Sequence, residues 1–138
     1  MRPPALVERG TDLVAIARSI DDRHGWLLAH DPDPGLASTI YQPGTRSYLD
    51  FTRNLATLQS RRQTLVSIGQ HCTYAVATVH PTLVSLRVHE QIHEDRVVDA
   101  RGHVVAVTRY DRPNDYVVVL TRGEGARWRL ADITQVAT

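Results

Sequence analysis

VSLRVHEQI, residues 84–92, alternates apolar and polar side chains over most of its length. With this period Val84, Leu86 and Val88 fall on one side of a β-strand, which indicates a sheet with one buried face. Strand-like segments continue on both sides, and Gly69 interrupts the preceding one as a candidate bulge. We therefore expect an antiparallel sheet of four to six strands in the second half of the chain. The expected strands span residues 66–79, 84–92, 97–98, 104–107, 116–121 and 128–136.

The first half of the chain has helical spacing instead. Thr11 is expected to cap a first helix, with Asp12 in its first turn, and Pro32 to end it. Asp21, Asp22 and Arg23 are expected on the solvent side of this helix. The apolar stripe of the helix comprises Leu13, Ile16, Ala17, Ile20, His24 and either Leu27 or Leu28.

A second helix is expected after a turn at Pro43-Gly44. Thr45 is its predicted N-cap, and the cations Arg61 and Arg62 stand at its negative pole. Its apolar face comprises Tyr48, Phe51, Leu55 and Leu58.

Helices followed by an antiparallel meander are typical of an α+β domain, with the helices packed on one face of the sheet. A sheet of this size twists and can curl around the first helix, which encloses an apolar interior. We predict a flexible N-terminal segment over residues 1–9 and a single domain over residues 10–138.

Composition excludes several classes of protein. The chain has 138 residues and 42% hydrophobic residues, enough to bury a core. All 16 basic residues are Arg, but 15 acidic residues offset them, so we expect no nucleic-acid partner. The single cysteine permits no internal disulfide. We also expect no membrane insertion by this chain, because no apolar run reaches the length of a membrane span, and no signal peptide is visible.

Four short motifs carry a family resemblance: IYQPGT (residues 40–45), Glu90-x-Ile92, VVDARG (residues 97–102) and RWRLADI (residues 127–133). The order of elements resembles the cystatin-like α+β roll of nuclear transport factor 2 (NTF2), ketosteroid isomerase and the SnoaL-like polyketide cyclases. The four motifs, with the helix after residue 45, look like the accessory domains of actinobacterial membrane-anchored or secreted proteins. That resemblance implies an NTF2-like roll and an extracytoplasmic location if residue 1 is a cloned start. A cytoplasmic location is expected if this is the full natural chain.

His89-Glu90-Gln91-Ile92-His93 matches H-E-x-x-H, the zinc metalloprotease motif. That chemistry requires a helix, in which the two histidines share one face and the Glu acts as base to a zinc-bound water. In a strand the two histidine Cα atoms lie about 13 Å apart, and Glu90 faces the opposite side. We therefore predict no metal site and no cofactor.

The interior of the expected cone is a candidate pocket for a small molecule. The related enzymes use a carboxylate or a histidine in such a cavity, where burial raises the pKa of a carboxylate. No catalytic Asp or Tyr of the isomerases aligns with this chain, so no catalytic residue is predicted. The candidate ligand-binding residues are Trp26, Tyr41, Tyr48, Arg87, His89 and Asp132.

Two functions compete. The first is a non-catalytic binding or accessory domain that takes a protein partner or a small hydrophobic ligand. The alternative is an enzyme similar to SnoaL or ketosteroid isomerase, which needs a pocket of ~300 Å³ or more with a buried titratable group. A homodimer through the open face of the sheet, near His89, Gln91 and His93, is a further expectation.

Overall fold

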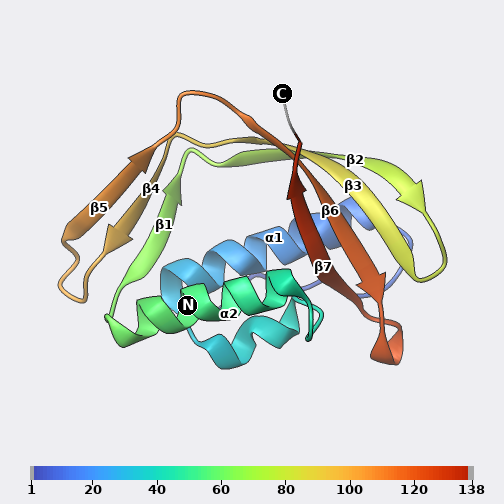
Figure 1. Cartoon of the computed structure of the whole chain (residues 1–138), viewed down its shortest axis with the longest axis horizontal. Coiled ribbons are helices and arrows are strands. Elements are labelled where there is room, and N and C mark those ends of the chain that lie inside the picture. The colour runs from blue at the N-terminus through green and yellow to red at the C-terminus, as the bar shows by residue number, and fades with distance from the viewer. Residues whose placement is uncertain (1, 137–138) are drawn as a thin grey trace.

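The structure, a computed structural model, describes residues 2–136. α1 (Leu13–His30), the short 3-10 helix η1 (Pro34–Thr39) and α2 (Arg46–Ser60) all lie on one side of a strongly bent set of strands (Figure 1). The predicted α+β architecture, with N-terminal helices packed on a curved antiparallel sheet, is confirmed.

The helices begin at side-chain caps. Thr45 caps α2 as predicted, because its hydroxyl accepts a hydrogen bond from the Tyr48 backbone N–H. The cap of α1 is Asp12, whose carboxylate accepts from the Ala15 N–H, and not Thr11 as expected. Asp and Thr both serve as caps, so the sequence alone placed the start of α1 one residue too early.

The strands form two antiparallel sheets within residues 2–136, in the orders β1-β4-β5 and β2-β3-β6-β7. The expected single sheet is therefore divided, because three chain segments pass from one sheet into the other through a short break. The strands are β1 (Thr64–Ile68), β2 (His71–Val79), β3 (Leu83–Gln91), β4 (Glu94–Val98), β5 (Val104–Arg109), β6 (Asn114–Arg122) and β7 (Trp128–Gln135), with the 3-10 turn η2 (Glu124–Ala126) before β7.

Gly69 makes the break between β1 and β2, where the sequence indicated a bulge. Its φ is +71°, and a Cβ built on it would clash with Cδ2 of His93. His93 stands at the matching break between β3 and β4. Its N–H donates to the Ile68 carbonyl at 2.9 Å, and its own carbonyl accepts from the Tyr110 N–H at 3.0 Å. These bonds continue the backbone pairing around the bend.

The core lies between the helices and the four-stranded sheet. Inward-facing β3 side chains pack there against α1 and α2. Its largest fully buried side chains are Ile16, Leu27, Ile40, Leu55, Val84, Leu86, Val88 and Leu120. No helix within residues 2–136 has both the length and the apolar character needed to cross a membrane.

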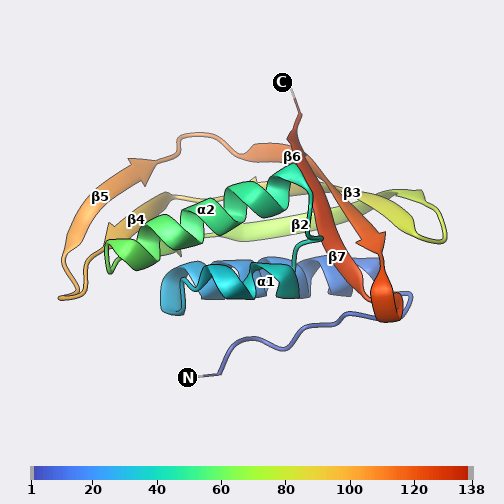
Figure 2. The same cartoon turned by 60° about the horizontal axis from the view of Figure 1, so that its bottom comes forward.

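The segment before α1 is held in place along that helix (Figure 2). Arg23 donates from Nη2 to the Pro4 carbonyl at 2.7 Å, and Ser19 Oγ accepts from the Val7 N–H at 2.9 Å. The Glu8 carbonyl accepts from the N–H of Trp128 on β7 at 2.8 Å. The flexible segment expected over residues 1–9 and the single domain expected over residues 10–138 both stay predictions, and residues 1, 137 and 138 lie outside the described residues.

Candidate functional site

A cavity of about 130 Å³ lies between α1 and the four-stranded sheet. Most of its wall is aliphatic, supplied by α1, β3, β6 and β7. The remaining wall is polar or aromatic, and all of these side chains carry a titratable group. They are Asp21, His24, Tyr41, Tyr74, Glu90 and Tyr116.

Asp21 and Tyr74 join α1 to β2 across the cavity wall. The Tyr74 hydroxyl donates to Asp21 Oδ2 at 2.8 Å, and the Arg18 guanidinium lies 5.0 Å from the centre of the Tyr74 ring. Burial, together with the negative charge of Asp21, raises the pKa of Tyr74 well above its usual value. Tyr74 is therefore a neutral donor, and Asp21 keeps a lone pair for a second donor.

Glu90 is the second carboxylate of the wall. Gln70 Nε2 donates to Glu90 Oε2 at 2.8 Å, and the Cys72 thiol lies 3.7 Å from the same oxygen. Cys72 and Glu90 are direct cross-strand partners in β2 and β3. Burial and the charge of Asp21 raise the pKa of the Cys72 thiol to about 12. The thiol therefore stays protonated at neutral pH and is a poor nucleophile.

His24 and Tyr41 complete the polar wall on the helical side. The His24 ring stacks on Phe51, with ring centres 4.4 Å apart. Burial lowers the pKa of His24, and the charge of Asp21 opposes part of that change. Burial also raises the pKa of Tyr41, which is only 2% exposed. At neutral pH the cavity therefore presents an uncharged imidazole and an uncharged phenol.

The arrangement suits a ligand that donates hydrogen bonds. Among residues 2–136, neither Asp21 nor Glu90 forms an ion pair. Both carboxylates are instead satisfied by neutral donors from Tyr74 and Gln70. A small molecule with an apolar body can fill the aliphatic part, and its hydroxyl or amine can donate to a carboxylate.

The H-E-x-x-H residues do not converge. The expected strand is present as β3, which ends at Gln91, and it places His89 and Glu90 on opposite faces. His89 Nδ1 instead lies 2.7 Å from Asp115 Oδ1. In the part of the chain that the structure describes, no three His, Cys, Asp or Glu side chains are grouped to hold a metal ion.

Of the predicted ligand-binding residues, only Tyr41 lies in the cavity wall. Trp26 lines a separate groove between α1 and β1, and Tyr48 packs half-buried against the core. The other three are on the outer face of the sheet, away from the helices, which corrects the expectation that they face the interior. Arg87 and His89 of β3 stand on either side of buried Val88 in the strand, so they point to the opposite face. Asp132 of β7 is exposed, and its cross-strand partner Val119 is next to buried Val118, so Asp132 also points outward.

Two carboxylates of the site were missed, although the sequence held a signal for both. Asp21 lies four residues after Ala17 on the buried stripe of α1, although we expected it on the solvent side. Glu90 continues the inward register of Leu86 and Val88. A carboxylate at a position where the periodicity predicts an inward apolar side chain is unusual, and it indicates a functional group.

Comparison with solved structures finds this fold elsewhere. The intermembrane space region of the chloroplast protein ARC6 matches with a TM-score of 0.64 at 12% identity, over 94% of this chain and 100% of that one. Aln2 from a Streptomyces species matches with a TM-score of 0.59 at 15% identity, over 94% and 93% of the two chains. A Catenulispora acidiphila protein in complex with S-DNPA matches with a TM-score of 0.54 at 16% identity, over 89% and 91%.

These likenesses concern the fold alone, and they agree with an NTF2-like α+β fold for this chain. No family model matches the sequence, and no curated relative matches it either.

Proposed function

We propose that this chain is a non-catalytic binding domain that holds a small, mainly apolar ligand in the cavity between α1 and the four-stranded sheet. The observation that carries the proposal is the cavity itself, with two carboxylates, Asp21 and Glu90, in an otherwise aliphatic and aromatic wall. Each is partly buried and has no cationic partner among residues 2–136, so its free lone pairs can accept from a donor on a ligand.

The size of the cavity limits the ligand. Its volume of about 130 Å³ is below the ~300 Å³ typical of drug-sized pockets. It is close to that of an engineered apolar cavity of about 150 Å³ that binds benzene. The proposed ligand is therefore about one ring in size, with a hydroxyl or amine that donates to Asp21 or Glu90. The S-DNPA complex of the Catenulispora protein supports ligand binding by this fold.

A titration with phenol tests the proposal. Phenol combines one ring with one donor, and benzene is the matched probe without the donor. Ala17→Leu adds a side chain inside the cavity, and Ala56→Leu makes the same change on the exposed side of α2. We expect the wild type and Ala56→Leu to bind phenol more tightly than benzene, and Ala17→Leu to bind neither. Equal phenol affinity in both variants would contradict the proposal.

His24 favours an alternative, an enzyme acting on a hydrophobic small molecule. Its lowered pKa leaves an unprotonated imidazole in the cavity wall, which is the form a general base requires. Such an enzyme would exchange an acidic C–H of a small ketone such as acetone with deuterium from solvent. Exchange that His24→Gln abolishes would support it, whereas equal exchange rates in the two proteins would refute it.

Three further expectations stay predictions. They are a homodimer through the open face of the sheet, a protein partner, and a role as an actinobacterial accessory domain. Exposed apolar side chains at the end of the β2–β3 hairpin, including Val79 at 63% exposure and Leu83 at 40%, favour contact with another protein. Sedimentation of the purified chain over a range of concentrations tests the dimer directly.

A further inference from the structure

Three polar side chains form a row across the outer face of the four-stranded sheet. Thr73 of β2 is the direct cross-strand partner of His89 of β3, which is in turn the partner of Asp115 of β6. His89 Nδ1 and Asp115 Oδ1 are 2.7 Å apart, and both side chains are almost half exposed. Because Asp115 accepts at Nδ1, the Nε2 atom of His89 stays free for another partner.

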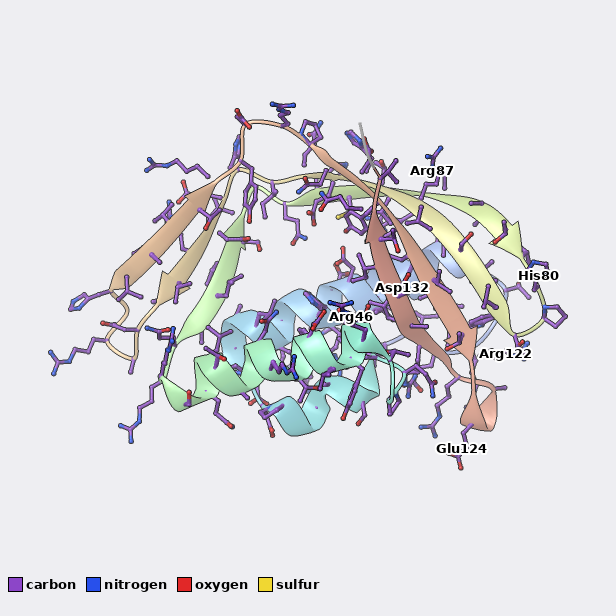
Figure 3. The ribbon with its side chains drawn as sticks, in the orientation of Figure 1. Arg46, His80, Arg87, Arg122, Glu124 and Asp132 are labelled. Carbon is purple, nitrogen blue, oxygen red and sulfur yellow. The ribbon has the colours of Figure 1, made fainter. Side chains whose placement is uncertain are left out.

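Arg87 extends this row toward the next position of β3. It lies two residues before His89, and side chains at this spacing share a face of the strand. Figure 3 shows Arg87 on the side of the sheet away from α1 and α2. No side-chain hydrogen bond or ion pair is present for Arg87 among residues 2–136. The side chains of Thr73, Arg87, His89 and Asp115 line a surface depression of about 360 Å³. We call this group of four residues the outer-face site.

We propose that the outer-face site binds the oxyanion group, carboxylate or phosphate, of a small ligand. The guanidinium of Arg87 offers paired N–H donors that match two oxygens of such a group. The Thr73 hydroxyl adds a donor, and protonated His89 adds another at Nε2. Asp115 lies 2.7 Å from Nδ1 and orients the imidazole, and its negative charge is part of the charge balance of the site.

The charges of the outer-face site make this binding depend on pH. With His89 neutral, the charges of Arg87 and Asp115 cancel. With His89 protonated, the site carries one net positive charge. The groups that face His89 are Asp115 from β6, Arg87 on its own strand, and His71, two residues from Thr73 on the same face of β2. The affinity for an anion should therefore be higher in acid, where the imidazole is protonated, than in alkali.

Sulfate is the probe for this test, because its charge does not change near neutral pH. Titration of the full chain, followed by amide chemical shifts, should show saturable binding at about pH 5.5 that is about tenfold weaker at about pH 8. The shifts should be largest at residues 73, 87, 89 and 115. Failure to saturate at both pH values, or shifts centred elsewhere, would overturn the proposal.

Variants assign the effect to side chains. Arg87→Gln should weaken sulfate binding about tenfold or more. Arg53→Gln removes the same charge from the exposed surface of α2 and should leave binding unchanged. His89→Gln should remove the pH dependence, whereas His71→Gln should retain it. Equal losses in Arg87→Gln and Arg53→Gln would reveal only nonspecific attraction and would overturn the proposal.

Phosphate and acetate distinguish the two forms of the ligand group. Both anions should compete with sulfate at the outer-face site, and the tighter one identifies the class of ligand. A failure of both to compete would contradict an oxyanion site. This outcome is independent of the interior cavity, because Arg87 and His89 face away from it.

Discussion

The Tyr74 hydroxyl donates a 2.8 Å hydrogen bond to the Asp21 carboxylate, and this bond connects β2 to α1 at the wall of the interior cavity. It brings together residues 53 positions apart in the sequence. A hydrogen bond to a charged acceptor contributes more than one between neutral groups. The pair therefore both connects the helix to the sheet and holds one carboxylate in position for the proposed ligand.

Tyr74→Phe should lower the free energy of unfolding by about 1–2 kcal/mol, because it removes this donor and leaves Asp21 with one partner fewer. Tyr48→Phe is the matched control, since Tyr48 is half-buried and its hydroxyl has no hydrogen-bond partner among the described residues. It should change stability by less than about 0.5 kcal/mol. Urea unfolding of both variants measures the difference. Equal losses would contradict the role of the Tyr74–Asp21 bond.

Gly69→Ala should destabilise the bend between the two sheets. The new Cβ would clash with His93 Cδ2, in a backbone conformation with φ of +71°. A residue with a Cβ in this left-handed backbone conformation lowers the free energy of unfolding by about 1–2 kcal/mol. The clash with His93 lowers it further. We expect a loss clearly larger than that of Gly102→Ala, where φ is +85° and no atom lies within 4 Å. Urea unfolding of the two variants measures both losses.

A double variant separates the two contributions at the bend. His93→Ala in the Gly69→Ala background removes the atom that the new Cβ meets. The cost of Gly69→Ala in that background should fall to the level of Gly102→Ala. If it stays as large as in the wild type, the close approach of His93 does not explain why glycine stands at this position.

His24 should make the stability of the fold sensitive to acid. Burial lowers its folded-state pKa below the unfolded value of about 6.5. The unfolded chain then binds a proton that the folded chain excludes, so this stability is present above pH 6.5 and is lost as the pH falls below it. The slope is at most about 1.4 kcal/mol per pH unit. His24→Gln should lose less stability between about pH 7 and about pH 5; a loss equal to that of the wild type would refute this assignment.

Cys72 should be unreactive while the chain is folded. It is 6% exposed, and burial and the charge of Asp21 raise the pKa of its thiol to about 12. Thiol reagents attack the thiolate, which is scarce at pH 8 for such a group. Labelling by Ellman's reagent should therefore be slow in buffer and fast in urea. Labelling at equal rates in the two conditions would show that the thiol is accessible in the folded chain, which would contradict this expectation.

Periodicity made much of the fold predictable. The alternation of β3 and the stripe of α1 indicated which faces are buried, and both are confirmed. The division into two sheets was not predicted, because it depends on three breaks that align in space. Gly69 alone marked one of them in the sequence. The contacts of His93 and Tyr110 at the bend are long-range and leave no local pattern.

The candidate site was less predictable than the fold. Aromatic residues from the helical half of the chain were chosen as cavity walls, but of those predicted only Tyr41, which lies between η1 and α2, lines the cavity. Arg87 and His89 were placed in the interior although their register with Val88 puts them outside. Asp21 was assigned to solvent by its charge. Its spacing from Ala17 places it on the inward stripe, and only its partner there, the Tyr74 hydroxyl on β2, leaves no local pattern in the sequence.

A crystal structure of the chain soaked with phenol tests directly whether the interior cavity is a binding site. We expect one phenol molecule between α1 and the four-stranded sheet, with its ring against Val118 and Leu120 and its hydroxyl within hydrogen-bond distance of Asp21 or Glu90. An interior filled by side chains, or phenol bound only on the surface, would contradict the proposed function.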